Sequence, residues 1–496
     1  MSEPPVANRH CAGASQTSLA LSWARHWLLL VAGLAVLAAP AGALGAPTPQ
    51  RNRQPITALG TLVQLPGSSG CLVDRSTPHV GCGRVRALRG PGPFLGSDAI
   101  AISPDGRNVY VASSRANAVA VFRRNARTGT LTQGSGVAGC IAAGGSGGCA
   151  KAIGLGAPNS VAVSADGGNV YATSLASNAV VALRRNRSTG ALTQLGRGGG
   201  CIANTATTGC ATGRALGGPD IVTVSPDGKS VYVGAFRGNA LAVFSRNPST
   251  GALTQPADTT GCFVDTPTAG CATAIALGAP EGIAISADGQ SVYVAAALSS
   301  ALDIFTRNTS TGVLTQAPGA AGCIVASALW GCALGVQIGG ADAVTVSPDD
   351  ADVYVTSLLS NSVTTFTRVS PGQLVQLSGT SACVVNVLAV GCSLGRELSA
   401  PEGLAVSPDG ANLYATSFTS GGLDVFNRNA SSGAVSQKPR APGCLVGRLI
   451  PGCRLGRALL GVSSVAVSHD GKYVYSVAFA SNAVGVFKRV TKAMTR

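Results

Sequence analysis

The sequence predicts an all-β protein: a seven-bladed β-propeller with four antiparallel strands per blade and an N-terminal strand that completes the last blade. The phrase Ser-x-Asp-x recurs seven times, from Ser103 to Ser468, at steps of 61 or 60 residues. Each unit holds four short runs rich in Val, Ile, Tyr and Phe, separated by Asp-Gly and Asn turns. Such runs are typical of strands joined by hairpins, and four per repeat are typical of a propeller blade.

The first unit shows the order of the expected strands, which lie at residues 98–103, 108–113, 118–122 and 130–133. The last unit has the corresponding runs at 464–468, 473–477 and 483–487 but ends before a fourth one. A fourth-strand sequence, GTLVQL, stands instead at residues 60–65, ahead of every unit. We expect it to pair with the last unit, because this closes the ring and covers a bare sheet edge.

The chain ends lie outside the repeats. Residues 1–46 carry basic residues followed by an apolar run and small residues, the layout of a signal peptide, and 27–46 is also about long enough to span a bilayer as an uncleaved anchor. Residues 47–57 are expected to form a linker, 58–491 the propeller and 492–496 a tail. We therefore expect a secreted or extracytoplasmic protein, with attachment to a membrane through the N-terminal segment as the alternative.

The cysteines support export. Apart from Cys11 in the leader, they form one close pair per unit, which predicts local disulfides, whereas a metal site needs cysteine or histidine in clusters of four. The expected pairs are Cys71 and Cys82, Cys140 and Cys149, Cys201 and Cys210, Cys262 and Cys271, Cys323 and Cys332, Cys383 and Cys392, and Cys444 and Cys453.

The segments that carry these cysteines are longer than the connection between blades requires. Crossing from an outermost strand to the next innermost strand takes about five extended residues, yet 25 residues separate Gln133 from Asn159. We expect the excess to form compact surface loops, pinned by the disulfides, on the face where the innermost strands begin. In three successive units these loops are apolar, so they are candidates for contact with a partner or membrane. The alternative is that their side chains pack against the blades. The candidate contact residues are Leu329, Trp330, Val387, Leu388, Leu449 and Ile450.

A polar position lies at the expected mouth of the central channel on the same face, five residues before each repeat serine. Carboxylate, amide and hydroxyl oxygens of this kind suit Ca²⁺ or Mg²⁺. The alternative is that they cap strand ends and face a solvated channel. These candidates are Asp98, Asn159, Asp220, Glu281, Asp342, Glu402 and Ser463.

Two other positions recur in every unit, an aspartate in the first hairpin turn and an arginine at the end of the third strand. We expect each pair to form an ion pair within its own blade. The aspartates are Asp105, Asp166, Asp227, Asp288, Asp349, Asp409 and Asp470, and the arginines are Arg124, Arg185, Arg246, Arg307, Arg368, Arg428 and Arg489.

The net charge of +15 indicates an anionic partner such as a cell-envelope polymer. A protein or a glycan is the alternative partner. Nucleic acid is not expected, because no basic stretch is interleaved with aromatic residues. We expect a monomer.

The units SPDGRNVYVAS, AVAVFRRN and TGTLTQ resemble those of the seven-bladed lactonase-type propellers, the group that includes the YVTN-repeat proteins. This resemblance implies lactone chemistry of the phosphogluconolactonase or carboxymuconate-cyclase kind. Those enzymes commonly have Pro-His at the start of an inner strand, whereas this sequence has no histidine there, which leaves Glu281 and Glu402 as the candidate acids or bases. From the residues themselves we expect a binding or scaffold protein that acts through its disulfide-pinned loops. The alternative is a lactonase-like hydrolase or cyclase whose site lies in the central channel. Catalysis at that site would proceed either with or without the help of a metal ion.

Overall fold

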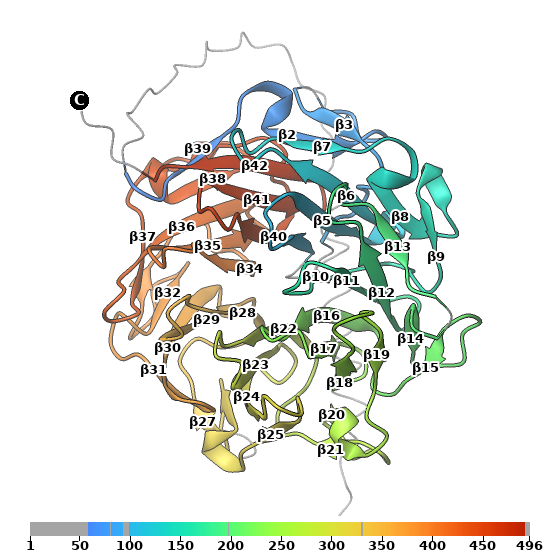
Figure 1. The fold of residues 1–496 in the computed structure, drawn as a ribbon. Coiled ribbons are helices and arrows are strands. Elements are labelled where there is room, and N and C mark those ends of the chain that lie inside the picture. The colour runs from blue at the N-terminus through green and yellow to red at the C-terminus, as the bar shows by residue number, and fades with distance from the viewer. Residues whose placement is uncertain (1–57, 80, 93–98, 197, 329–330, 492–496) are drawn as a thin grey trace, which may run out of the picture. The chain divides into compact units, whose positions relative to one another are not determined.

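The computed structural model describes residues 58–491, apart from residues 80, 93–98, 197 and 329–330. Seven six-stranded sheets surround a central axis, so the predicted seven-bladed propeller is confirmed (Figure 1). Blades 1 to 6 follow one another along the chain, and blade 7 combines C-terminal with N-terminal strands. The predicted leader, linker and tail lie outside the described residues, as does Asp98. No helix among the residues that are described is long and apolar enough to cross a membrane.

The three inner strands of each blade form an antiparallel meander. The innermost strands are β4 (Ile100–Ile102), β10 (Val161–Val163), β16 (Pro219–Val224), β22 (Pro280–Ile285), β28 (Ala341–Val346), β34 (Pro401–Val406) and β40 (Val462–Val467). The second strands are β5 (Asn108–Ser113), β11 (Asn169–Ser174), β17 (Ser230–Ala235), β23 (Ser291–Ala296), β29 (Asp352–Ser357), β35 (Asn412–Ser417) and β41 (Tyr473–Ala478). The third strands are β6 (Ala118–Arg124), β12 (Ala179–Arg185), β18 (Ala240–Arg246), β24 (Ala301–Arg307), β30 (Ser362–Ser370), β36 (Gly422–Arg428) and β42 (Ala483–Arg489).

The fourth place in each blade is shared by two short strands that both pair with the third strand. The first of each couple is β7 (Leu131–Gln133), β13 (Leu192–Gln194), β19 (Leu253–Thr254), β25 (Leu314–Gln316), β31 (Gln373–Gln376), β37 (Val435–Gln437) or β1 (Leu62–Gln64). The second begins at a cysteine and is β8 (Cys140–Ala143), β14 (Cys201–Ala203), β20 (Cys262–Val264), β26 (Cys323–Val325), β32 (Cys383–Val385), β38 (Cys444–Val446) or β2 (Cys71–Asp74).

A further strand pairs in parallel with each cysteine strand and forms the outer edge of the blade. These edge strands are β9 (Ala150–Ala152), β15 (Ala211–Thr212), β21 (Ala272–Thr273), β27 (Ala333–Leu334), β33 (Ser393–Leu394), β39 (Arg454–Leu455) and β3 (Gly83–Val85). The segments expected to form compact surface loops are therefore strands in part, and each cysteine strand pairs with the first residues of its third strand, at the end of the blade where the inner strand begins. The extra residues instead widen each blade outward, because their backbone groups satisfy the bare edge of the third strand.

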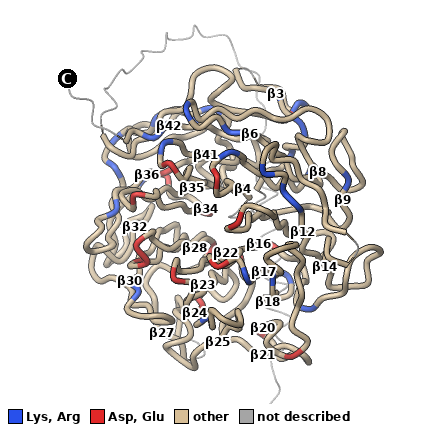
Figure 2. The backbone as a smooth tube through the Cα atoms, viewed as in Figure 1, with Lys and Arg blue, Asp and Glu red and all other residues tan. Residues whose placement is uncertain are grey.

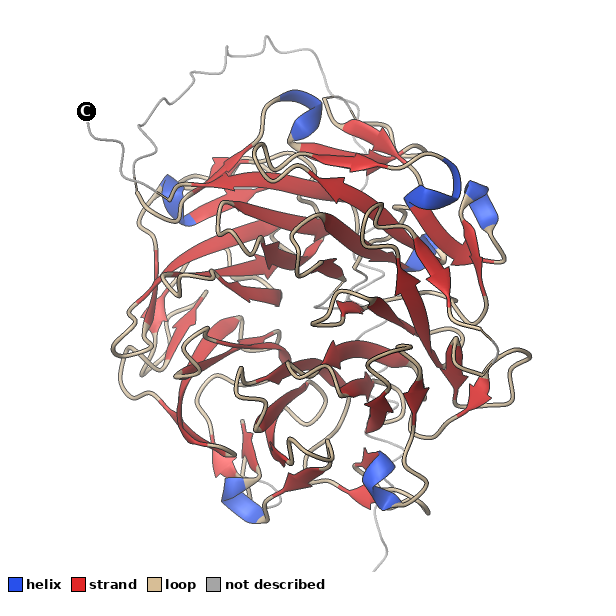
Figure 3. Ribbon diagram, in the orientation of Figure 1, coloured by secondary structure: helices blue, strands red, loops and turns tan. Residues whose placement is uncertain are grey.

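Helical structure in the described part of the chain consists of short 3₁₀ turns, which lie mainly in the outer parts of the blades (Figure 3). They are η1 (Gly67–Ser69), η2 (Ser114–Ala116), η3 (Gly136–Gly139), η4 (Ser146–Gly148), η5 (Thr259–Gly261), η6 (Gly319–Ala321) and η7 (Ala441–Gly443).

Strand β1 closes the ring as predicted. It pairs antiparallel with β42, with Leu62 opposite Arg489 and Gln64 opposite Phe487. The Leu62 side chain is fully buried in a cluster that includes Phe487 and Tyr414. The two ends of the propeller are thus held in one sheet.

Neighbouring blades are joined at each seam by a tyrosine, an arginine and an aspartate. At the seam of blades 1 and 2, the Arg185 guanidinium donates to both carboxylate oxygens of Asp105, at 2.9 and 2.7 Å. Its Nε also donates to the Tyr110 hydroxyl at 2.9 Å. The predicted pairing of aspartate and arginine within one blade was wrong, because the arginine reaches the preceding blade in all seven cases, with distances of 2.6 to 2.9 Å.

One seam differs from the others. Between blades 4 and 5, Arg368 keeps its ion pair with Asp288, but the Tyr293 hydroxyl and the Arg368 Nε have no hydrogen-bond partner among the described residues. Blade 5 is the unit with a step of 60 residues, and its β30–β31 hairpin is shorter by one residue. At the other seams a glycine carbonyl accepts a hydrogen bond from the tyrosine hydroxyl, as Gly312 does from Tyr232 at 2.8 Å. The shorter hairpin of blade 5 brings no such carbonyl to Tyr293 in the described structure.

All seven predicted disulfides are formed, with Cα–Cα distances between 4.7 and 5.0 Å. Each links the start of a cysteine strand to the segment that leads into the edge strand. Seven disulfides in one chain indicate an oxidising compartment, such as the space outside the cell.

Candidate functional site

The candidate channel residues stand at the start of the inner strands, where five of these strands are irregular. The register shifts at Asp220, Glu281, Asp342, Glu402 and Ser463, between the first strand residue and the regular part that follows. A bulge of this kind inserts an extra residue and redirects its side chain, which is frequent beside active sites. The Ser-x-Asp-x spacing locates this position, but nothing in it indicates the bulge.

Glycines next to two of these residues let the inner strands approach one another. A Cβ atom on Gly282 would lie 2.4 Å from the carbonyl oxygen of Asp342, and one on Gly403 would lie 2.6 Å from that of Ser463. Only glycine fits such contacts between backbones. The Pro-Glu-Gly sequences at 280–282 and 401–403 therefore bring each glutamate close to the next blade, a role that our sequence analysis missed.

The channel residues are buried rather than solvated. The exposed fractions of Asn159, Asp220, Glu281, Asp342, Glu402 and Ser463 are 3% or less. The alternative prediction of a solvated channel at this level was thus wrong for the described members of the set. Figure 2 shows acidic residues near the centre of the propeller and many of the lysines and arginines further out.

Asn159 and Asp220 form one contact across the seam of blades 2 and 3, in which the Asn159 amide donates to Asp220 Oδ1. Burial raises the pKa of Asp220 to about 8. The hydrogen bond from Asn159 lowers this pKa, and the charge of Asp342 raises it further. Asp220 Oδ2 and Asn159 Oδ1 have no partner among the residues described. Asp220 is therefore mostly protonated at neutral pH.

Glu281 of blade 4 and Asp342 of blade 5 interact across the seam between these two blades. Burial raises the pKa of Glu281 well above its usual value, and the charges of Asp342, Asp220 and Glu402 raise it further. Burial also raises the pKa of Asp342, to about 6, while a hydrogen bond from Glu281 opposes this rise. The pair thus holds one proton at neutral pH, with Glu281 as the acid and Asp342 as the carboxylate.

The other two described positions belong to different surroundings. Glu402 is fully buried and close enough to Glu281 for their charges to interact. The Ser463 hydroxyl donates to the Gly92 carbonyl at 2.8 Å, in the connection that leads into blade 1. The structure therefore gathers four carboxyl groups and Asn159, whereas Ser463 is engaged elsewhere.

The predicted Ca²⁺ or Mg²⁺ site stays a prediction. Within the described ranges, no three or more His, Cys, Asp or Glu side chains are grouped closely enough to hold a metal ion. Asp98, the remaining candidate oxygen ligand, lies outside those ranges.

The candidate partner-contact residues fall into two groups. Val387, Leu388 and Leu449 are exposed, and Ile450 is partly exposed, while Leu329 and Trp330 lie outside the described residues. The preceding residues of the same segments are buried, because they belong to the cysteine strands β26, β32 and β38. Packing against the blades is thus confirmed for the strands, whereas contact of the exposed tips with a partner or membrane stays a prediction.

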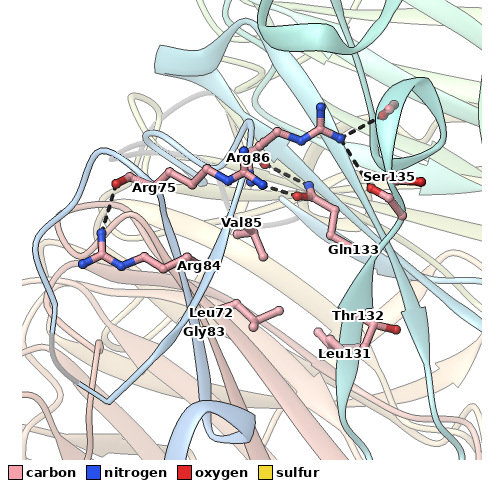
Figure 4. Close-up of a pocket in the computed structure, with 12 residues that line it drawn as sticks. Leu72, Arg75, Gly83, Arg84, Val85, Arg86, Leu131, Thr132, Gln133 and Ser135 are labelled. Carbon is pink, nitrogen blue, oxygen red and sulfur yellow. Dashed lines mark hydrogen bonds between the residues drawn. The ribbon is translucent and has the colours of Figure 1, made fainter.

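A pocket of about 560 Å³ lies elsewhere, between the N-terminal strands of blade 7 and β7 of blade 1 (Figure 4). Arg75, Arg84 and Arg86 contribute to its lining. Two of them are engaged with backbone oxygens, since Arg84 donates to the Arg75 and Thr77 carbonyls and Arg86 to that of Gly136. The channel residues do not contribute to this pocket.

The chain matches the family described as "Lactonase, 7-bladed beta-propeller" over residues 95–207 and 202–325, from blade 1 into blade 4. The fold is a seven-bladed propeller, and the part of it from blade 1 into blade 4 is similar in sequence to this family. The resemblance noted in the repeat units is thereby confirmed.

Solved structures also resemble this propeller at low identity. A periplasmic gluconolactonase of Pseudomonas aeruginosa is 14% identical with a TM-score of 0.49, over 76% of this chain and 89% of that one. A hydrazine synthase of Kuenenia stuttgartiensis is 16% identical with a TM-score of 0.47, over 81% and 98%. A functionally unknown protein of Desulfotomaculum acetoxidans is 16% identical with a TM-score of 0.48, over 78% and 94%. No curated protein matches the chain in sequence.

Proposed function

We propose that the protein is a lactonase-like hydrolase whose acid and base are the buried carboxyl groups at the start of the inner strands. The observation that carries this proposal is the gathering of Asp220, Glu281 and Asp342, each 3% exposed or less, at the irregular starts of three successive inner strands, where burial raises all three pKa values. Groups whose pKa values are driven apart by burial and by one another's charge are typical of acid–base sites. The partial match to the lactonase family supports a lactone as the substrate class.

In the proposed reaction, a lactone reaches the carboxyl groups from the channel mouth, which requires side chains around the axis to move, because these groups are 3% exposed or less. The Asp342 carboxylate takes a proton from a water molecule, and the oxygen of that water adds to the lactone carbonyl carbon. The bond between the carbonyl carbon and the ring oxygen then breaks. A protonated neighbour, Glu281 or Asp220, gives its proton to the departing ring oxygen, so that the product is a hydroxy acid. The pKa of about 6 at Asp342 keeps the base ionised at neutral pH.

The experiment is hydrolysis of a panel of five- and six-membered lactones by the purified protein and its Glu281→Gln, Asp342→Asn and Glu402→Gln variants. We expect the first two to lose about 10²-fold or more in kcat, and Glu402→Gln to lose less. Asp303→Asn is the matched control, because Asp303 is also fully buried with a raised pKa but lies on a third strand, away from the axis. The proposal fails if no lactone is hydrolysed, or if Asp303→Asn lowers the rate as much as Asp342→Asn.

The binding or scaffold role that the sequence favoured has less support. It depended on disulfide-pinned loops gathered on the channel-mouth face, and those segments are outer strands of the blades.

A further inference from the structure

The outer edge of the propeller carries a position at which the seven blades differ systematically. It is the second residue of each edge strand, and it lies beside the third residue of the neighbouring cysteine strand. Every side chain at this position is exposed. Around the ring, from blade 7 to blade 6, the residues are Arg84, Lys151, Thr212, Thr273, Leu334, Leu394 and Leu455.

Leucine at this position is not required by the fold. Four blades place a charged or hydroxyl side chain on the same backbone site, and their sheets have the same strand order. Yet Leu334, Leu394 and Leu455 are 65%, 61% and 62% exposed. A single exposed leucine is ordinary, but three at equivalent places on adjacent blades form a pattern that intrablade packing does not explain.

The disulfide-linked tips of the same blades extend this apolar surface. Val387, Leu388 and Leu449 are 77%, 73% and 82% exposed. Together with Leu334, Leu394 and Leu455, we call them the rim band. The equivalent tips of blades 1 and 2 are made of glycine, serine, threonine and alanine. Strands β27 and β39, which carry Leu334 and Leu455, lie on the same side of the propeller with blade 5 between them (Figure 1).

The charges beside the rim band have one predominant sign. The outer segments of blades 4 to 6 (residues 314–340, 373–400 and 435–461) contain a single acidic residue, Glu397. Against it stand the cations Arg396, Lys438, Arg440, Arg448, Arg454 and Arg457. Of these, Arg440 and Arg448 are exposed, and Arg448 directly precedes Leu449. Apolar side chains with neighbouring arginines can bind a lipid bilayer, because its acyl chains take up apolar side chains and its anionic headgroups attract arginine.

We propose that the rim band binds the surface of an anionic lipid bilayer, with its leucines in the interfacial layer and the neighbouring arginines on lipid phosphates. A second copy of the chain fits less well. The band follows the convex outer wall of three blades, so two rigid copies would meet along only part of it, and their arginines would repel one another. A fluid headgroup layer can adapt to a convex wall and supplies the opposite charge. This proposal is independent of lactone hydrolysis at the axis.

The test uses the chain from Ile56 onward, which forms a compact unit and contains all the strands, disulfides and seam contacts described above. Its co-sedimentation is measured with vesicles of phosphatidylcholine alone and with vesicles that contain phosphatidylglycerol. The test variant replaces Leu334, Leu394 and Leu455 by threonine, which the chain itself holds at Thr212 and Thr273. The matched control replaces Val137, Leu298 and Val369, which are 63%, 59% and 62% exposed outside the band, by threonine.

We expect binding to phosphatidylglycerol vesicles that weakens at high salt, a loss of about tenfold or more in the triple leucine variant, and no change in the control. Circular dichroism and a thiol assay check that each variant is folded and fully disulfide-bonded. The proposal is overturned if the parent protein does not bind these vesicles, or if both triple variants bind equally well. It is also overturned if the parent forms a dimer without lipid that the leucine variant abolishes, since the band would then be a contact between copies.

Discussion

At the scale of single residues, six of the seven seam arginines donate from Nε to a tyrosine hydroxyl of the preceding blade, and Arg368 is the exception. The Arg307 guanidinium donates to the Asp227 carboxylate, to the Tyr232 hydroxyl and to the Gly289 carbonyl. Its side chain is fully buried, while Asp227 is partly exposed. A buried charge is tolerated only when its hydrogen bonds are satisfied, so removal of any one partner costs stability.

The irregular seam between blades 4 and 5 gives a direct comparison. Tyr232→Phe removes a hydroxyl that accepts from Arg307 and donates to Gly312, both at 2.8 Å, so we expect a loss of about 1–3 kcal/mol in the free energy of unfolding. Tyr293→Phe removes a hydroxyl with no partner in the described structure, and we expect a change within about 0.5 kcal/mol. Denaturant unfolding of the two variants checks this. Equal losses would contradict it.

The buried carboxyl groups predict how stability depends on pH. Burial raises the pKa of Asp220 to about 8 in the folded protein, above the value near 4 in an unfolded chain. The folded state therefore holds a proton that the unfolded state releases, and the resulting stabilisation is complete below about pH 4 and is lost as the pH rises toward 8. For one proton, the free energy of unfolding falls by about 1.4 kcal/mol for each pH unit in this window.

Asp220→Asn should flatten the fall in unfolding free energy between pH 5 and 8, because the amide does not titrate. Asp227→Asn serves as the comparison, since hydrogen bonds and the Arg307 charge lower the pKa of Asp227 below its usual value despite partial burial. Its contribution is present above about pH 4 and is lost only as the pH falls below this value, so that variant should leave the fall between pH 5 and 8 unchanged. Parallel curves for Asp220→Asn and the parent protein would show that Asp220 is ionised in the folded state.

At the scale of elements, strand β1 is a distant segment that completes a sheet. Leu62 is fully buried against blade 7, whereas the next residue, Val63, is partly exposed. We expect Leu62→Ala to lower the free energy of unfolding by about 2–5 kcal/mol and Val63→Ala to lower it by less than about 1.5 kcal/mol. Urea unfolding followed by far-UV circular dichroism measures both. A larger loss from Val63→Ala would place the strand in the opposite register.

The repeats predicted the three inner strands and the closing strand, because those runs are long enough to show apolar alternation and lie between clear turn signals. The outer strands could not be recognised in the same way. Strands such as β15 and β21 have two residues each, too few for any periodicity, and they form because the neighbouring cysteine strands offer an unpaired edge. The seam ion pairs also depend on how adjacent blades are placed, which the sequence of one unit does not specify.

The site was partly predictable for a similar reason. A fixed distance from the repeat serine located Asp220, Glu281, Asp342 and Glu402 at the axis. Their burial and shared protons depend on the close approach of neighbouring inner strands, which Gly282 and Gly403 permit. One repeat unit does not reveal what the adjacent unit places against it.

At the scale of the whole molecule, seven disulfides repeat one stabilising link around the ring. On the chain-entropy model each closed loop contributes about 2.5–3 kcal/mol. We expect the double variant Cys201→Ala, Cys210→Ala to lose about this much, and a second double variant at Cys383 and Cys392 to lose a similar amount. Since blades 2 and 5 are not neighbours, the two losses should add to within about 0.5 kcal/mol in the quadruple variant. Equilibrium unfolding in urea tests this, and a clearly smaller combined loss would contradict it.

The pairing of β1 with β42 has a consequence for biosynthesis. A ribosome produces β1 before every other strand of the propeller and β42 after all of them. The earliest strand must therefore wait, unpaired, until translation is nearly finished. During that interval the nascent chain exposes a strand with free backbone donors and acceptors, which is vulnerable to pairing with other polypeptides. Protection of this segment by a chaperone would be needed most while blades 1 to 6 are already assembled and the ring is still open.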